Sequence, residues 1–168
     1  MIFVTVGSQK FQFNRLLVAL DEYVANGDIT DELFAQIGNS DYERRNYPFK
    51  KFLNKKEYDE FENRADIIIS HGGTGAIMGA LKKRKKVVAV PRLSEYKEHI
   101  NNHQLEVVEE LTENNIICSC RDLNNLCETI NEAKQKEFKP FVSNADVFID
   151  SINGYLIELQ SIKDLKRR

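Results

Sequence analysis

Residues 66–75 decide the fold, and they read Asp-Ile-Ile-Ile-Ser-His-Gly-Gly-Thr-Gly. The three isoleucines make a short apolar, β-branched run, which is typical of a strand buried on both faces. Three glycines follow at once, and Ile77, Met78 and Leu81 then recur at helical spacing. A strand, a glycine turn and a helix in this order indicate one unit of a parallel α/β sheet.

The same alternation extends along most of the chain. Further buried strands are expected where short apolar runs occur, at Ile2–Val6, Leu33–Ile37, Ile67–Ser70, Val87–Val90 and Ile116–Cys120. Helical patterns run from Phe13 to Val24, from Asn54 to Ala65, after Gly75 through Leu81, from Ile100 to Leu111 and from Leu123 to Ala133. These patterns predict a single Rossmann-like α/β domain over residues 1–168, with a parallel sheet covered by helices on both faces.

Composition narrows the function classes. The 168 residues carry 24 Lys+Arg against 26 Asp+Glu, a formal net charge of −2, which argues against a dedicated nucleic-acid binder. No run approaches the roughly 20 apolar residues of a membrane helix, and no signal peptide is recognisable at the start, so a cytoplasmic location is expected. Cys118, Cys120 and Cys127 fit no zinc or redox spacing and are expected to be reduced thiols.

The last apolar pattern departs from the alternation. Phe148, Ile152, Tyr155, Leu159 and Ile162 follow one another at steps of four and three, as on one face of a helix. Two interpretations stay open: a terminal helix packed on its own sheet, or a helix over 144–162 that docks a partner chain.

Two places after predicted strands are suited to binding a ligand, because ligands of open α/β sheets lie at the carboxyl ends of the strands. One is Gly7-Ser8, and the other is the glycine loop after Ser70. Glycines at a helix start let backbone N–H groups approach an anion such as phosphate. The loop is neither a P-loop nor a dinucleotide fingerprint, because no Lys-Ser/Thr pair follows and Met78 replaces the third glycine. A purely structural turn is the alternative.

Polar side chains are dense beside these loops. His71 precedes the glycines, where it is expected to donate to a phosphate oxygen or to titrate near neutral pH, or else to be a buried structural histidine. Residues 91–104 bring together a guanidinium, carboxylates, imidazoles and amides, which suit sugar hydroxyls and a uracil edge. A solvated polar loop that caps a helix is the alternative for this segment.

Residues 66–75, 87–92 and 99–104, with the opening Phe3-Val4-Thr5-Val6-Gly7-Ser8, together resemble the nucleotide-sugar half of GT-B glycosyltransferases. The resemblance is closest to the small catalytic subunit of two-subunit enzymes, namely the eukaryotic dolichol-linked N-acetylglucosamine transferase and bacterial capsule or exopolysaccharide transferases. It implies a UDP-sugar donor, a lipid-linked saccharide acceptor and a membrane-anchored partner subunit that holds this acceptor. The chain would then lie on the cytoplasmic membrane face through its partner, docked by residues 144–162.

The resemblance also implies roles for individual residues. The donor diphosphate would contact the glycine loop, Gly72, Gly73, Thr74 and Gly75, with His71 beside it. Gly7 and Ser8 would line the cleft floor, and Arg92 would mark the uridine-proximal loop. His103 and Gln104 would lie near the sugar, and the binding set would also include Glu98, His99 and Asn102. His71 and His103 are the expected catalytic residues.

One position departs from the resembled family. Relatives place a glutamate that grips the ribose hydroxyls four residues after the last glycine, where this chain has Gly79. Glu95 or Glu98 is the expected substitute.

The mechanism that follows is metal-independent transfer with inversion at the anomeric carbon. No Asp-x-Asp metal motif appears, and backbone N–H groups would stabilise the departing UDP. The general base would come from the partner subunit. Two alternatives remain: a non-catalytic module that binds a nucleotide or sugar phosphate, and a UDP-sugar epimerase-like protein that forms a homodimer.

Overall fold

A six-stranded parallel sheet organises the chain. The computed structural model describes residues 1–43, 46–100, 103–143 and 149–156. Over these residues the strands are β1 (Ile2–Thr5), β2 (Leu33–Gln36), β3 (Phe49–Lys50), β4 (Ile67–Ser70), β5 (Lys86–Ala89) and β6 (Cys118–Ser119). Their order in the sheet is β3-β2-β1-β4-β5-β6, with every pair parallel, so the order reverses between β1 and β4. The predicted fold class is confirmed.

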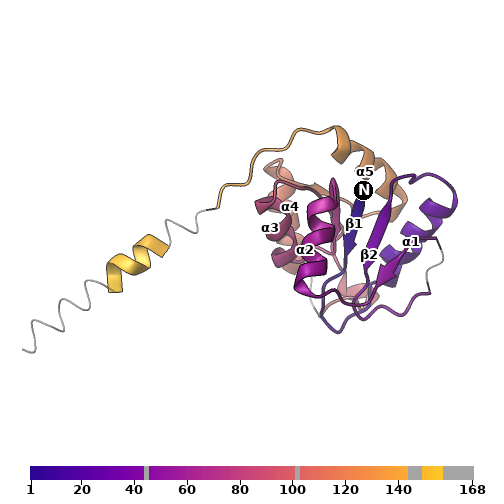
Figure 1. Cartoon of the computed structure of the whole chain (residues 1–168), viewed down its shortest axis with the longest axis horizontal. Helices are drawn as coiled ribbons and strands as arrows, with labels where there is room; N and C mark the ends of the chain where they lie inside the picture. Colours follow the sequence, from indigo (N-terminus) through magenta and orange to yellow (C-terminus); the bar gives the residue numbers. More distant parts are fainter. Residues whose placement is uncertain (44–45, 101–102, 144–148, 157–168) are drawn as a thin grey trace, which may run out of the picture.

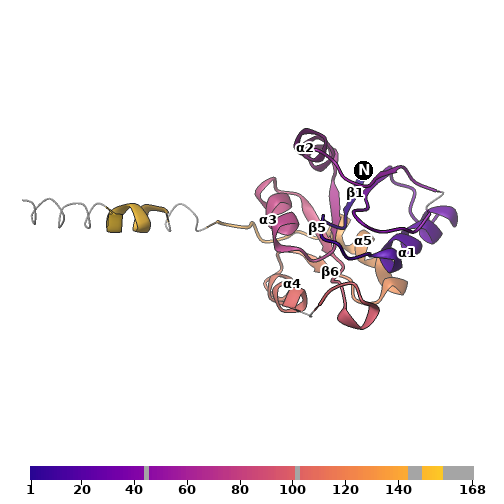
Figure 2. The same ribbon diagram turned by 90° about the horizontal axis from the view of Figure 1, so that it is seen from below.

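Helices cover both faces of this sheet. They are α1 (Asn14–Ala25), α2 (Lys55–Arg64), α3 (Thr74–Lys82), α4 (His103–Glu113) and α5 (Leu126–Gln135). Short 3-10 turns span Ser94–Tyr96 and Leu123–Asn125. Two perpendicular views place α1 and α5 on one face and α2, α3 and α4 on the other (Figures 1 and 2).

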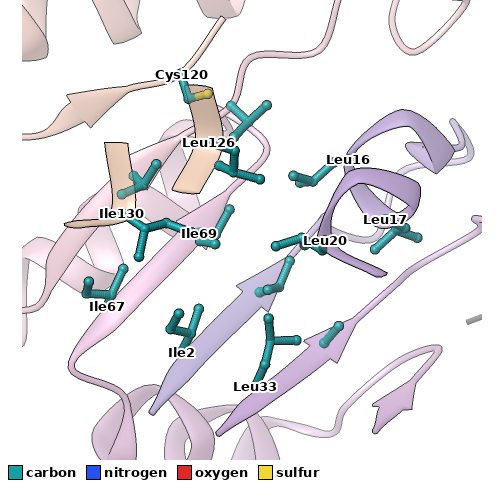
Figure 3. Packing of buried hydrophobic residues seen from close by; sticks show 14 of the residues in the cluster. Ile2, Leu16, Leu17, Leu20, Leu33, Ile67, Ile69, Cys120, Leu126 and Ile130 are labelled. Atoms are coloured by element: carbon teal, nitrogen blue, oxygen red, sulfur yellow. The ribbon is translucent and has the colours of Figure 1, made fainter. Parts of the chain in front are cut away.

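The central strands are buried on both faces. Ile2, Ile67 and Ile69 point toward α1 and α5, where they meet residues such as Leu20 (Figure 3). Alternate residues such as Phe3 pack with the helices of the opposite face. Successive side chains of a strand point to opposite sides, so a strand between two helix layers requires an uninterrupted apolar run. The runs in the sequence therefore mark the middle layer of the domain.

Several element ends differ from the prediction. β3 was not predicted, because its two residues are exposed at the sheet edge and carry no apolar run. The fourth helix begins at His103 rather than at Ile100, whose side chain is 78% exposed and lies off the core. The expected strand over 116–120 shortens to β6, and a 3-10 turn precedes α5. The three cysteines are free thiols, as expected.

The C-terminal segment is helical over residues 149–156. This helix projects away from the α/β domain in both views (Figures 1 and 2). Ile149, Ile152, Tyr155 and Leu156 are all exposed, by 44% to 61%. The interpretation in which this stripe packs on its own sheet is therefore wrong for the described part. The other stripe residues, Phe148, Leu159 and Ile162, lie outside the described residues.

Across the parts of the chain that the structure describes, no helix has the length and apolar character needed to cross a membrane.

A capping box begins α2. The Asn54 side chain accepts a hydrogen bond from the Glu57 backbone N–H at 3.0 Å, and the Glu57 carboxylate accepts one from the Asn54 backbone N–H at 2.9 Å. Two N–H groups that the helix leaves without an internal partner are satisfied in this way.

We expect Asn54→Ala to lower the free energy of unfolding by about 1 kcal/mol, because it removes this cap. Asn63→Ala is the matched control, since Asn63 is an exposed residue of the same helix. Urea unfolding of both variants checks the prediction, and equal losses in the two would contradict it.

Candidate functional site

A hollow of about 720 Å³ lies where the carboxyl ends of β1 and β4 meet. This is the point where the strand order reverses, at which open α/β sheets bind ligands. Most of the predicted site residues line it, namely Gly7, Ser8, His71, Gly73, Thr74, Gly75, His99 and Gln104. The structure therefore brings together the two loops that were separate in the sequence.

Glycine is required where these loops approach each other. Gly7 and Gly72 adopt φ angles of +76° and +84°, which side chains disfavour. A Cβ at Gly7 would lie 2.7 Å from the His71 ring, and one at Gly73 would overlap that ring. The imidazole is therefore packed between the β1 and β4 loops. Gly72 itself does not line the hollow; it makes a tight turn beside Pro91.

His71 has a defined protonation state. The side chain is 8% exposed, and its Nδ1 lies 3.2 Å from the Thr5 carbonyl oxygen. A carbonyl only accepts hydrogen bonds, so Nδ1 carries the proton and Nε2 is an acceptor. Burial, with a further effect from the positive charge of Arg92, lowers the pKa of His71 from 6.5 to about 4. His71 is neutral at pH 7, so the prediction that it titrates near neutral pH or donates to a phosphate is wrong.

The start of α3 lines part of the hollow. Gly73 is the N-cap of this helix, and no described side chain caps it. Thr74, Gly75 and Ala76, the first three helical residues, all line the hollow. Their N–H groups have no partner inside the helix and stand at the positive end of its dipole. This arrangement suits a phosphate group.

Arg92 and Glu98 are structural and not ligands, contrary to the prediction for both. Arg92 is fully buried, and its Nη2 donates to the carbonyl oxygens of Val6 at 2.7 Å and Phe11 at 3.2 Å. Burial lowers its pKa to about 10, so it stays charged at pH 7 while it holds the β1 loop. Glu98, also fully buried, accepts from the Arg15 Nε and Nη2 and from the Leu93 N–H. Neither side chain lines the hollow.

Of the other binding residues predicted in the polar segment 91–104, some line the hollow and others lie outside the described residues. His99 packs near Phe11, with ring centroids 5.4 Å apart, and lines the hollow. Gln104 does so too, and its buried Oε1 has no hydrogen-bond partner among the described residues. Asn102 and the side chain of His103 lie outside the described residues.

The hollow also contains residues that the sequence reasoning missed. They come from the ends of β1 and β2, the loop after β1, the segment around α2 and the first turn of α3, and they are Thr5, Gln9, Gln36, Phe52, Leu53, Tyr58 and Ala76. Thr5 and Gln36 are polar residues at the last positions of β1 and β2, and this placement was a usable signal. Tyr58 gave no such signal in the sequence, because it belongs to the apolar side of a predicted helix. Burial raises the pKa of Tyr58 above its usual value.

Among the residues that the structure describes, no three or more His, Cys, Asp or Glu side chains are grouped to hold a metal ion.

Comparison with known proteins identifies the family. Residues 1–152 match the glycosyltransferase family 28 C-terminal domain. The chain belongs to this family. Among its curated relatives, the human UDP-N-acetylglucosamine transferase subunit ALG13 is 28% identical over 131 residues, 73% of this chain and 11% of the human protein. The Candida albicans subunit of the same name is 27% identical over 74% of this chain and 40% of its own length. The chain thus spans less than half of these relatives.

Solved structures agree on the fold of this family 28 domain. The glycotransferase of kitacinnamycin superposes with a TM-score of 0.62 at 18% identity, over 80% of this chain and 35% of that chain. An NMR structure of ALG13 superposes with a TM-score of 0.56 at 19% identity, over 84% of this chain and 89% of that chain. The expectation that the chain has the fold of the C-terminal half of a GT-B glycosyltransferase is confirmed.

The neutral burial of His71 predicts a pH dependence of stability. The unfolded chain binds a proton near pH 6.5 and the folded chain only near pH 4, so protonation below pH 6.5 favours unfolding. Between pH 7 and pH 5 we expect the wild type to lose about 2 kcal/mol more than His71→Asn, which does not titrate. Urea unfolding at both pH values measures this difference. Parallel losses in the two proteins would contradict the neutral state.

Proposed function

We propose that this chain is the catalytic, donor-binding subunit of an inverting glycosyltransferase. It would transfer a sugar from a UDP-sugar to a lipid-linked acceptor in glycan or polysaccharide biosynthesis. The observation that carries this proposal is the hollow at the strand-order reversal, where the uncapped start of α3 faces a glycine loop. Membership of glycosyltransferase family 28 and relatives named as UDP-N-acetylglucosamine transferase subunits support it.

The proposed chemistry uses preorganised backbone dipoles. The donor diphosphate lies against the N–H groups of Thr74, Gly75 and Ala76. The acceptor oxygen forms a bond to the anomeric carbon while the bond to UDP breaks, and the electron pair leaves on the diphosphate. Charge that develops there is stabilised by these N–H groups and the α3 dipole, so the proposal requires no metal ion.

The general base that takes the acceptor proton is proposed to lie outside the hollow. His71 has a pKa of about 4, too low for an efficient base at neutral pH. Its Nε2 instead accepts a hydrogen bond from a sugar hydroxyl and orients the donor. His103 stays a proposed catalytic residue near the sugar. The base that takes the acceptor proton is proposed to lie on the partner subunit.

A partner subunit is part of the proposal. A complete GT-B cleft lies between two domains, and the described residues form one. The relatives are named as subunits, which supports a second polypeptide that carries the acceptor half. The exposed apolar stripe of residues 149–156 is the proposed docking element. A membrane-anchored partner would hold the chain at the cytoplasmic membrane face.

Reconstitution tests the proposed function. The chain is combined with its candidate partner, a panel of UDP-sugars and a lipid-linked acceptor, and products are identified by mass spectrometry and NMR. Transfer with inversion of the anomeric configuration is expected. Nucleotide binding without transfer would favour a binding module, and conversion of the sugar by the chain alone would favour an epimerase.

Substitution at Gly75 tests the diphosphate contact. An added Cβ there meets no described atom within 4 Å, whereas one at Gly73 would strike His71. We expect Gly75→Asp to weaken UDP binding at least about tenfold and to abolish transfer, because its carboxylate repels the phosphates at short range.

Gly75→Asn, nearly identical in shape but neutral, is the matched control and should bind UDP far better than the aspartate variant. Both variants should keep the wild-type melting temperature, since acidic groups are tolerated at a helix start. Equal UDP affinity in the two variants, measured by calorimetry, would contradict the phosphate assignment.

A further inference from the structure

A larger hollow, here called the basic hollow, opens at the opposite edge of the sheet. It has a volume of about 1000 Å³ and is lined mainly by the end of α3, the start of β5 and residues 135–143 at and after the end of α5. β5 begins at Lys86, so the basic hollow lies where the parallel strands start. It shares no lining residue with the hollow at the ends of β1 and β4, and is therefore separate from the proposed donor site.

The segment after α5 crosses this edge from one helix layer to the other (Figure 1). Phe138 packs against the core cluster beneath α1 and α5, and Phe141 packs against the cluster on the opposite face of the sheet. The Lys139 N–H donates to the Asn115 carbonyl oxygen at 2.9 Å, and the Asn115 side chain donates to the Glu137 carbonyl oxygen at 3.1 Å. This wall of the basic hollow is thus attached to the domain.

Positive charge dominates the basic hollow. Six of its fifteen lining residues are cationic and one is acidic; the cations are Lys82, Arg84, Lys85, Lys86, Lys136 and Lys139. Within the described residues, only Lys136 of these six forms an ion pair, with Glu132. Lys85 and Lys86 donate to carbonyl oxygens, which completes hydrogen bonds but leaves the positive charges uncompensated. The whole chain has a formal net charge of −2, so this excess is local.

The ends of the neighbouring helices account for only part of this charge. α3 and α5 both end at the basic hollow, and each C-terminal end carries roughly half a negative charge that nearby cations offset. Arg84 moreover occupies the left-handed position after α3, with a φ of +56°, where glycine is the usual residue. An arginine at this position is disfavoured relative to glycine, so its charge is present in spite of backbone strain.

The shape and the lining of the basic hollow favour a peptide over other anions. Leu81, Ile116, Phe138 and Phe141 add apolar surface beside the cations. A free phosphate makes no use of apolar contacts, and the flat array of headgroups on a bilayer suits an exposed basic face better than a concave one. A protein segment that carries both acidic and apolar side chains matches both kinds of lining, as acidic motifs do on clusters of basic residues.

We propose that the basic hollow binds an acidic, partly apolar segment of a partner protein. Because the site lies at the far edge of the sheet, this segment can be bound while a nucleotide occupies the hollow at the ends of β1 and β4. The inference goes beyond the proposed function and does not depend on it. It assigns the chain an interface separate from the exposed stripe of residues 149–156.

NMR titration of the full chain locates the site. The probe is a synthetic peptide that repeats Glu-Phe-Asp-Ser three times, and its neutral counterpart has Gln and Asn in place of Glu and Asp. We expect the acidic peptide to shift the amide signals of residues 82–86 and 136–143, with an affinity that falls as salt is added. No binding up to millimolar concentration, shifts confined to other parts of the chain, or equal affinity for the neutral peptide would overturn the proposal.

Charge reversal supplies a matched comparison. Arg84→Glu combined with Lys139→Glu should weaken binding of the acidic peptide at least about tenfold, because repulsion replaces attraction. Lys51→Glu combined with Lys56→Glu changes the net charge equally outside the basic hollow and should keep the wild-type affinity. All four side chains are exposed, so both variants should remain folded, which thermal unfolding checks. Equal weakening in the two variants would mean attraction to overall charge and would overturn the proposal.

Two other anions separate the peptide from the remaining occupants. Tripolyphosphate represents a free phosphate compound, and vesicles with phosphatidylserine represent a membrane surface. We expect both to bind the wild type more weakly than the acidic peptide does, because neither fills the apolar part of the hollow. Tighter binding of either one, lost in the Arg84 and Lys139 double variant, would reassign the basic hollow to that ligand. None of these outcomes alters the test of UDP binding at the other edge of the sheet.

Discussion

The packing of the His71 ring between two glycine loops is the contact on which the site depends. Its Nδ1 bonds the Thr5 carbonyl at the end of β1, and its edge lies against Gly7 and Gly73. The ring therefore joins the loop after β1 to the loop after β4, the two strands between which the sheet order reverses. A side chain at either glycine would displace the ring. The two loops can face a common ligand only because both are glycine at the point of contact.

The hollow is lined mainly by backbone dipoles and neutral groups. Two buried charges, Arg92 and Glu98, hold loops: Arg92 donates to the carbonyl oxygens of Val6 and Phe11, and Glu98 accepts from Arg15 and from the Leu93 N–H. His71 is kept neutral by burial. The start of α3 is the part of the hollow that suits an anion, because its N–H groups are fixed in direction at the positive end of the helix dipole.

Much of the fold could be predicted from local patterns. The run Ile67–Ile69 and the glycines after it predicted β4, the turn and α3, because a strand covered on both faces requires continuous apolar residues. β3 escaped prediction because two exposed edge residues produce no such run. Ile100 was expected on a helix face, yet it is exposed in the polar loop. A short apolar pattern can match helical spacing by coincidence, and it does so at Ile100.

The candidate site, like the fold, could be predicted only in part. The α/β class, the strands at the centre of the sheet and the glycine loops at their ends could be predicted from the sequence, since they follow from periodicity and from the backbone freedom of glycine. Which polar residues reach the hollow depends on how the helices, strands and loops pack together. This packing buried Arg92 and Glu98 as loop supports and brought Tyr58 from α2 to the hollow. Residue type does not encode direction: the packing of distant segments determines whether a charged side chain faces a ligand or another part of the chain.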